Sequence, residues 1–417
     1  MSLWRNGDFL RLWSAQTISQ FGSQVTMLAL PLAAILVLHA TAFEVAALTT
    51  VEWLPWLVFS LPAGVWVDRL PRRRVLVVTD LGRAAALVSI PVVYAFDALT
   101  LWQLYAVGFV AGTLTVFFEV GYTAYLPALV ERRQLADGNA KVEITRSAAQ
   151  LGGPGLAGQL VQLFSAPVAI LADAISFVGS ALFLATIRRR EEVRPRAERT
   201  RLRTELLEGI RFVLGHPYMR PSMGFVASAN FFYNVMFGIF LVYAVRSLDF
   251  DAARIGLLFT LSNVGVLAGA LLATRIGRVL GVGPTIVATA FMLGWPLLFI
   301  PLVEGSYAFP VLVGVFAVTG FNGVVTNVVG VSLFQATTPD RLQGRAAASR
   351  RLVNLGAVPV GSLAGGILAT TIGLRETLWV GAIGATLAFL PLFFSPIRKL
   401  REMPEEPVEA LAASAGP

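Results

Sequence analysis

We single out three acidic residues inside long apolar stretches of the sequence, where a charge is costly and therefore informative. Glu52 occurs in VEWLPWLVFSLPAG, Glu119 in TVFFEVGYTAYLP and Asp173 in LADAISFVGS. Away from water a carboxylate can hold its proton at neutral pH and release it elsewhere, as a proton carrier must. We therefore predict that Glu52, Glu119 and Asp173 handle protons. The alternative is a clasp between helices, and it is strongest for Asp173.

Carboxamides recur at helical spacing in two other apolar stretches. Gln16, Gln20 and Gln24 stand four residues apart, which places them on one helix face. An amide facing lipid would be left without a hydrogen bond, so the row must face protein or a cavity. Asn230 and Asn234 repeat the pattern beside aromatic residues. We predict that substrate contacts come from Gln20, Gln24, Asn230, Tyr233 and Asn234. The alternative is hydrogen bonding between packed helices.

The elements that carry these residues are membrane spans. The chain has 417 residues, of which 56% are hydrophobic and 14% charged, whereas a soluble domain has about 25% charged residues. A span needs about 20 mostly apolar residues. Such runs occur at roughly 12–38, 45–67, 75–96, 101–124, 146–164, 167–187, 219–245, 253–274, 283–303, 307–331, 347–370 and 376–397. The fifth is the least regular, because LGGPGLAG interrupts it.

The basic residues predict how the spans are oriented. On the loops assigned to the outside only Arg246, Arg254 and Arg375 occur, so both termini are expected in the cytoplasm. The long polar segment RRREEVRPRAERTRLRTELLEGIRFVLGHPYMR separates two halves, and within it Glu205–Leu214 has helical spacing. The predicted divisions are a six-helix half at 1–187, a basic linker at 188–218, a second six-helix half at 219–397 and a tail at 398–417.

Composition also excludes several functions. There is no cysteine, and the two histidines, His39 and His216, lie far apart, so no metal site is expected. We find no Ser–His–Asp set, no paired catalytic acids and no G-x-x-x-x-G-K-[ST] loop. We therefore expect no catalytic residues, no cofactor and no enzyme activity. The net charge of +8 follows from basic loops rather than from nucleic-acid binding. No cleavable signal peptide is evident.

A charged stretch from Gly64 to Arg83, GVWVDRLPRRRVLVVTDLGR, lies between the second and third runs. We expect it to be a loop at the membrane surface. It resembles the signature G-x-x-x-D-R-x-G-R-R/K of major facilitator superfamily transporters, with Pro71 where the family usually has glycine. The matching residues are Gly64, Asp68, Arg69, Arg72 and Arg73. The resemblance implies a gate, in which Arg69 and Arg72 pair with Asp68 and with the carbonyl end of a neighbouring helix.

The fifth run resembles the antiporter signature of this superfamily at Gly153, Pro154 and Gly158, although Ala157 replaces one glycine. That signature is typical of exporters, and Gly153 and Pro154 would bias gating; a generic small-residue packing face is the alternative. The segments LPWLVFSLPAGVWVDRLPRRR, FFEVGYTAYLPALV and LADAISF are similar to the bacterial efflux branch of macrolide and enterobactin exporters. This resemblance implies an all-α membrane protein with twelve transmembrane helices in two pseudo-symmetric halves, whose first and seventh spans line a central cavity.

The expected function is therefore secondary active export of an amphipathic small molecule, a drug-like compound or a siderophore. Export would cross the bacterial inner membrane by alternating access, exchanged for protons. Uptake or uniport of a small metabolite is the alternative. The expected partners are this substrate, protons and membrane lipids, with no nucleic acid, and the protein is expected to be a monomer. One departure concerns coupling: the fourth run contains no arginine or lysine, so Glu52 and Glu119 would act without the basic partner that many drug–proton antiporters have there.

Overall fold

The computed structural model describes residues 3–67, 69–188 and 202–404. In these ranges the chain forms helices and no strand. Eleven helices of the described part are long and apolar enough to cross a membrane. A further helix, α5 (Leu135–Phe164), has spanning length but begins with a polar turn. The predicted class, an all-α membrane protein with twelve transmembrane helices in two halves, is confirmed.

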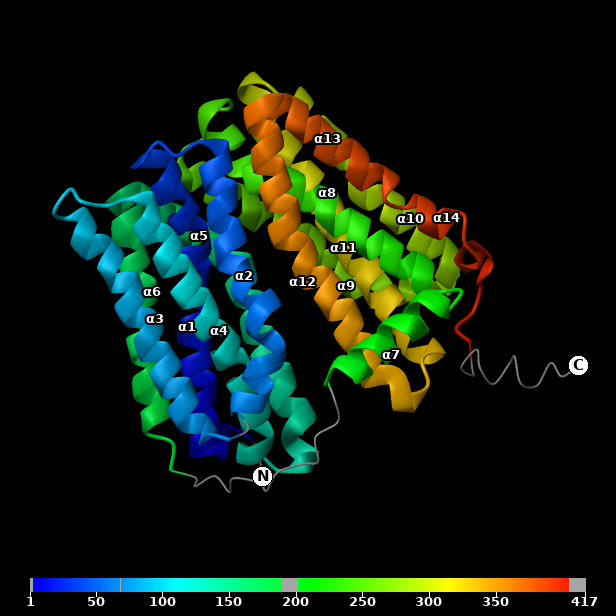
Figure 1. Ribbon diagram of the computed structural model, residues 1–417, viewed down its shortest axis with the longest axis horizontal. Helices are drawn as coiled ribbons and strands as arrows, with labels where there is room; N and C mark the ends of the chain where they lie inside the picture. Colours follow the sequence, from blue (N-terminus) through cyan, green and yellow to red (C-terminus); the bar gives the residue numbers. More distant parts are fainter. Residues whose placement is uncertain (1–2, 68, 189–201, 405–417) are drawn as a thin grey trace, which may run out of the picture. The chain divides into compact units, whose positions relative to one another are not determined.

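The helices follow the order expected from the apolar runs (Figure 1). The first half contains η1 (Leu3–Arg5), α1 (Gly7–Leu36), α2 (Ala42–Val67), α3 (Arg72–Tyr94), α4 (Leu101–Leu129), η2 (Arg132–Gln134), α5 and α6 (Ala166–Ala185). The second half contains α7 (Leu202–Gly215), α8 (Met219–Arg246), α9 (Ala252–Leu280), α10 (Val282–Gly294), η3 (Trp295–Leu302), η4 (Gly305–Tyr307), α11 (Ala308–Thr337), α12 (Asp340–Thr371), α13 (Leu374–Leu387), α14 (Leu390–Phe393) and η5 (Pro396–Lys399).

Two of the spans are interrupted, and they are not the expected one. α5 runs unbroken through LGGPGLAG. Instead, α10 passes into the 3-10 helix η3, and α13 ends before the short α14. η3 contains two prolines, Pro296 and Pro301, and Pro391 lies in α14. Each proline removes a backbone N–H and crowds the preceding turn, and two within one short segment leave little regular α-helix.

The chain forms two compact units. The first comprises Met1–Arg196 and Leu241–Thr260, and the second Ala197–Phe240 and Leu261–Pro417. The end of α8 and the beginning of α9 therefore belong to the first unit. This division is an observation about packing, and the predicted linker and tail boundaries stay predictions.

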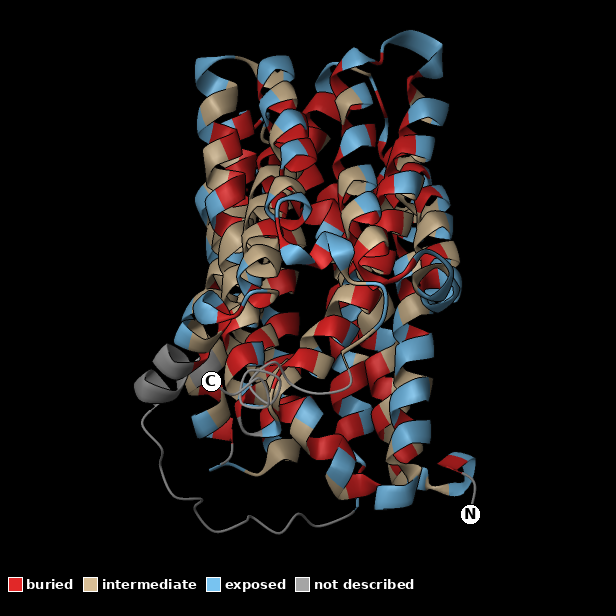
Figure 2. Ribbon diagram, turned by 90° about the vertical axis from the view of Figure 1, so that its right-hand side faces the viewer, coloured by how far each residue is buried: buried red, intermediate tan, exposed pale blue. Residues whose placement is uncertain are grey.

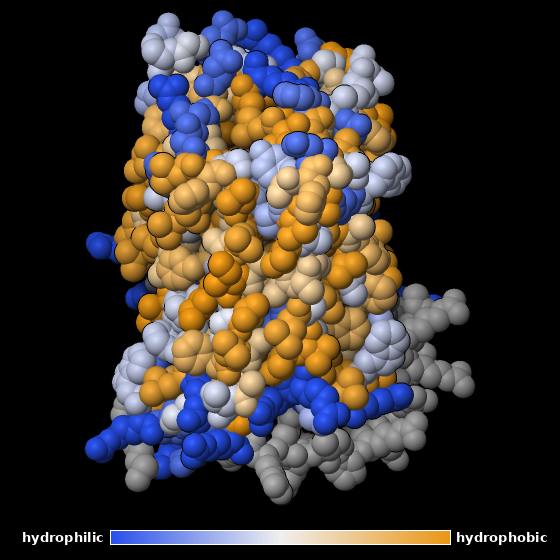
Figure 3. Space-filling view, turned by 90° about the vertical axis from the view of Figure 1, so that its left-hand side faces the viewer, coloured by the Kyte–Doolittle hydropathy of each residue, from blue (hydrophilic) through white to orange (hydrophobic). Residues whose placement is uncertain are grey.

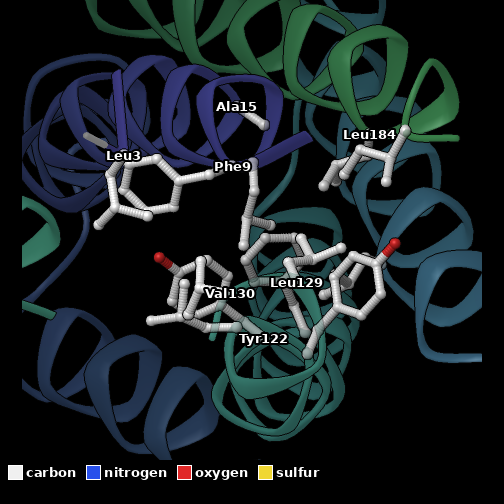
Figure 4. Packing of buried hydrophobic residues seen from close by; sticks show 13 residues of the cluster. Leu3, Phe9, Ala15, Tyr122, Leu129, Val130 and Leu184 are labelled. Atoms are coloured by element: carbon white, nitrogen blue, oxygen red, sulfur yellow. The ribbon is translucent and has the colours of Figure 1, made fainter. Parts of the chain in front are cut away.

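In the first unit α1 packs against α5 and α6, α3 against α4 and α6, and α2 against α4. An apolar cluster from η1, α1, α3, α4 and α6 holds these helices together, and Phe9 and Tyr122 are buried in it (Figure 4). The face that α3 and α6 present to the viewer carries a broad hydrophobic band between hydrophilic ends (Figure 3). This is the pattern that a membrane-embedded surface requires.

In the second unit α10 packs on α11, α13 on η3, and α7 on α12. Buried and exposed positions alternate along the helices of this unit (Figure 2). The close approach of α7 to α12 depends on Gly209, because a Cβ there would lie 2.5 Å from the backbone oxygen of Arg345. The helix predicted within the linker is thus confirmed as α7.

Candidate functional site

A charged pair lies buried inside the first unit, on one face of α3. Asp80 and Arg83 form an ion pair, and the two residues are 0% and 3% exposed. The guanidinium carbon of Arg83 lies 4.3 Å from the ring centre of Phe118 on α4 and 4.0 Å from that of Phe177 on α6. Three helices therefore enclose the cation.

A second buried carboxylate, Asp173 of α6, belongs to the same region. Its Oδ2 accepts a hydrogen bond from the hydroxyl of Thr26 on α1 at 2.5 Å, and its Oδ1 accepts one from Ser176 at 3.0 Å. Gly22 makes this approach of α1 to α6 possible, because a Cβ at that position would lie 2.5 Å from Asp173 Oδ1. Asp173 is 1% exposed, so the expected acid is indeed enclosed by helices.

Arg83 and the two carboxylates form one electrostatic cluster, which we call the Asp80–Arg83–Asp173 cluster. The charges of both Arg83 and Asp80 act on Asp173. If both acids are ionised, the cluster has two negative charges and one positive charge. An uncompensated charge is costly in a buried site, and one proton held by the cluster would remove its excess negative charge.

The two expected glutamates lie elsewhere in the first unit. Glu52 of α2 packs against α4, where a Cβ at Gly108 would lie 3.0 Å from Glu52 Cγ. Within the described chain its carboxylate forms no hydrogen bond or ion pair. Glu119 follows Phe118 directly, so it projects about 100° away from the side of α4 that contacts Arg83, and its charge acts on Tyr122. Of the three predicted acids, the structure brings Asp173 alone to Asp80 and Arg83.

The glutamine row of α1 faces protein. Gln16 is buried, and its amide oxygen has no hydrogen-bond partner in the part of the chain described. Gln24 lies against α5, since a Cβ at Gly153 would come within 2.5 Å of Gln24 Cβ and Cγ. Gln20, between them, is partly exposed. Gln24, which is also partly exposed, therefore takes part in packing α1 on α5.

On α8 the amides and the aromatic rings have different roles. Asn230 and Asn234 each donate a hydrogen bond to the carbonyl four residues earlier, at 2.8 Å. Asn234 is also packed against α12, 3.0 Å from the position of a Cβ on Gly361. Tyr233 stacks on Phe237 with ring centres 5.5 Å apart, and both rings are partly exposed. These rings offer an apolar contact surface, whereas the amide donors are used within their own helix.

The predicted gate loop is short. α2 ends at Val67 and α3 begins at Arg72; Asp68 lies outside the described residues, and its pairing stays a prediction. Arg73 donates a hydrogen bond to the carbonyl oxygen of Ala185 at the end of α6. The contact with a helix carbonyl end that we expected of Arg69 and Arg72 is thus made here by Arg73. Arg69 is exposed, Arg72 is partly buried, and no atom lies within 4 Å of a Cβ placed on Gly64.

The glycines of the fifth span allow close packing within the first unit. A Cβ on Gly158 would lie 2.9 Å from the Cα of Gly256 on α9, and a Cβ on Gly155 would lie 2.9 Å from Thr260 Oγ1. Pro154 is buried in the same helix. By contrast, a Cβ on Gly152 would meet no atom within 4 Å. The signature therefore marks a backbone contact between α5 and the beginning of α9.

Sequence reasoning missed Asp80 and Arg83. We described the whole stretch from Gly64 to Arg83 as a surface loop, although both residues also lie in the third predicted span, 75–96. The span is confirmed, and the loop is shorter than described, because the helix α3 already begins at Arg72. The signal was present: an acid and a base three residues apart, inside the apolar run LVVTDLGRAAALV, share one helix face. We also looked for a buried basic residue on the fourth span alone, whereas the structure places the buried arginine on α3, where it pairs with Asp80 rather than with Glu52 or Glu119.

A helical bundle of membrane-spanning length that encloses charged side chains is the architecture of a polytopic membrane transporter. The profile of the transmembrane secretion effector family, a part of the major facilitator superfamily, matches residues 1–415, and the chain belongs to this family. It is 24% identical to the multidrug efflux pump Tap of Mycolicibacterium fortuitum, over 96% of this chain and 98% of that protein. It is also 24% identical to macrolide efflux protein A of Streptococcus pyogenes, over 94% and 97% of the two chains.

Solved structures show the same fold. A bacterial homologue of the iron transporter ferroportin superposes with a TM-score of 0.75 at 18% identity, covering 94% of this chain and 99% of that one. The nucleoside transporter NupG superposes with a TM-score of 0.74 at 13% identity, covering 93% and 98%. The chain is thus a multi-span membrane transporter of an efflux family.

Proposed function

We propose that this transporter exports an amphipathic small molecule across the bacterial inner membrane in exchange for protons, and that the Asp80–Arg83–Asp173 cluster holds the exchanged proton. Its termini would lie in the cytoplasm, and the protein would act as a monomer. The observation that carries the coupling proposal is the buried set of two acids and one base, whose charges act on one another. The efflux relatives support the direction of transport and the kind of substrate.

The cluster could couple proton binding to helix movement because its members come from different helices. Arg83 contacts Phe118 of α4 and Phe177 of α6, and Asp173 is bonded to Thr26 of α1. A proton on either acid removes the excess negative charge and changes how strongly Arg83 is held between them. Alternating access needs such a change in the relative stability of two packed arrangements.

The aromatic side of α8 supports the substrate class. Tyr233, Phe237 and Phe240 form a stacked row, and Phe240 packs edge-on against Phe316 of α11. Such rings bind flat apolar surfaces without demanding one fixed arrangement of hydrogen bonds. This suits a transporter of bulky amphipathic compounds, with a few polar groups such as Gln20 for orientation.

The test uses purified protein in proteoliposomes with radiolabelled erythromycin and an imposed pH difference. Asp80→Asn and Asp173→Asn are expected to bind erythromycin but to lose transport driven by the pH difference, because neither amide can exchange a proton. Glu131→Gln is the matched control, since its exposed ion pair with Arg133 contributes little to stability.

Glu52→Gln and Glu119→Gln are tested in parallel. If both aspartate variants still move erythromycin against its gradient under a pH difference alone, the cluster does not hold the coupling proton. If the glutamine variants lose this transport while the asparagine variants keep it, coupling belongs to the glutamates instead.

A further inference from the structure

A pocket of about 280 Å³ lies between the end of α11 and the first half of α12. Phe334, Gln335, Arg350, Arg351 and Asn354 are among its lining residues. The pocket belongs wholly to the second unit, at the end of the unit where α7 packs on α12. Neither the predicted substrate contacts nor the proton cluster includes any of these residues.

Arg350 is the group that defines the chemistry of this pocket. Its Nη2 donates a hydrogen bond to Asn327 Oδ1 on α11 at 3.0 Å, and its guanidinium carbon lies 5.6 Å from the ring centre of Phe334. The side chain is partly buried and forms no ion pair with any carboxylate of the described residues. These contacts fix the guanidinium in place and leave its charge without an anion. A partly desolvated cation without a counterion favours the binding of an anion.

The other lining groups also suit an anion. Among the described residues no acid lines the pocket, while Gln335 and Asn354 supply amide groups and Arg351 a second guanidinium. Between Arg341 and Asn354 the sequence contains four arginines and no acid. Basic pockets between transmembrane helices are known to bind acidic lipid headgroups.

We infer that this pocket binds an oxyanion, either the phosphate of an anionic phospholipid or the acidic group of an amphipathic solute. Pockets that enclose a whole drug-sized ligand start at about 300 Å³, so this one suits a headgroup with its chains outside. The guanidinium of Arg350 would contact two oxygens of the anion through its parallel N–H groups. The inference does not depend on proton coupling, because binding needs no gradient.

The experiment measures binding by calorimetry in dodecylmaltoside, with dioctanoyl phosphatidylglycerol as the lipid probe and cholate as the carboxylate probe. Arg350→Gln is expected to weaken binding of the preferred probe by about tenfold or more, as expected for the loss of a charge-assisted contact. Arg278→Gln is the matched control, because it removes an exposed arginine at the end of α9. We expect it to change the affinity less than twofold, which is the scatter expected from a general charge effect.

The two probes distinguish whether the bound oxyanion comes from a phospholipid or from an acidic solute. Tighter binding of the phospholipid, lost in Arg350→Gln, identifies a lipid site, and the same result with cholate identifies a subsite for acidic solutes. Arg350→Lys is a second variant in case Arg350→Gln misfolds. It keeps the positive charge but not the two parallel N–H groups of the guanidinium, so its affinity for the probe should lie between those of the wild type and Arg350→Gln. If neither probe responds to Arg350→Gln, or if Arg278→Gln weakens binding equally, the inference is wrong.

Discussion

Removing Arg83 tests the buried cluster most directly. Arg83→Gln deletes the cation that is paired with Asp80 and enclosed by Phe118 and Phe177. Breaking a buried ion pair from one side typically costs about 3–5 kcal/mol, because the remaining charge is left uncompensated. Each desolvated cation–π contact adds about 1–2 kcal/mol. Since Asp80 can take up a proton in response, we expect a net loss of about 4 kcal/mol.

The loss can be read as a melting temperature in detergent. For a unit of about 200 residues, 1 kcal/mol corresponds to about 2–4 °C. Arg83→Gln should therefore lower the melting temperature by roughly 10 °C. Asp80→Asn alone is expected to lose less, because it leaves a cation that Asp173 can still attract.

The decisive variant combines Asp80→Asn with Arg83→Gln. The two amides are uncharged and can hydrogen-bond to each other, so the double variant should be more stable than Arg83→Gln alone by about 2 kcal/mol. Wild-type protein and all three variants are compared in one detergent. If the double variant loses the sum of the two single losses, the residues are not energetically coupled and the cluster is not a functional unit.

Three further outcomes are expected elsewhere. Gly158→Ala should destabilise the protein by about 1–3 kcal/mol, because the added methyl group would overpack against the backbone of α9. Gly152→Ala meets open space and should be neutral or slightly stabilising in the same melting assay. Equal effects of the two substitutions would show that the α5–α9 contact does not depend on Gly158. Arg73→Gln should lower the stability by about 1 kcal/mol, because it removes the hydrogen bond to the carbonyl end of α6. Arg74→Gln changes an exposed neighbour and should leave the stability unchanged. A similar loss in both variants would show that the effect comes from the overall charge of the loop. Reporter fusions in the linker and at the C-terminus should both read as cytoplasmic, and an external signal from either would reverse the proposed orientation.

Hydropathy predicted most of the fold because a membrane leaves few alternatives. In lipid every backbone polar group must be satisfied within the segment, so a long apolar run becomes a helix. The details that it could not predict depend on packing. α5 begins at Leu135, well before the expected residue 146, because its polar first turns lie beyond the apolar run. The 3-10 segment after α10 depends on two prolines whose combined effect is not visible in average hydropathy.

The candidate site was predictable only in part, for a different reason. Asp173 was found because it is a single acid in an apolar run. Asp80 and Arg83 were missed because five charged residues lie just before them, from Asp68 to Arg74, and the charged stretch was taken as one loop. That Arg83 lies near Asp173 could not be deduced, because it depends on the approach of α1, α3 and α6 through small residues such as Gly22.

The distribution of buried charge separates the tasks of the two halves. In the described chain the buried charged side chains are Asp80, Arg83 and Asp173, and all lie in the first unit. The buried polar groups of the second unit are amides, hydroxyls and His216, whose Nδ1 accepts a hydrogen bond from the backbone N–H of Tyr218. A buried ion pair is weak evidence for stability, since apolar residues of similar size often serve as well. Three such groups in one half are better explained by a step that changes charge. We therefore propose that the first half exchanges protons and that the neutral aromatic contacts to substrate, from Tyr233 to Phe316, belong to the second half. Tyr233→Ala should then weaken erythromycin binding and leave the dependence of transport on the pH difference unchanged. A Tyr233→Ala variant with an altered pH dependence would contradict this division.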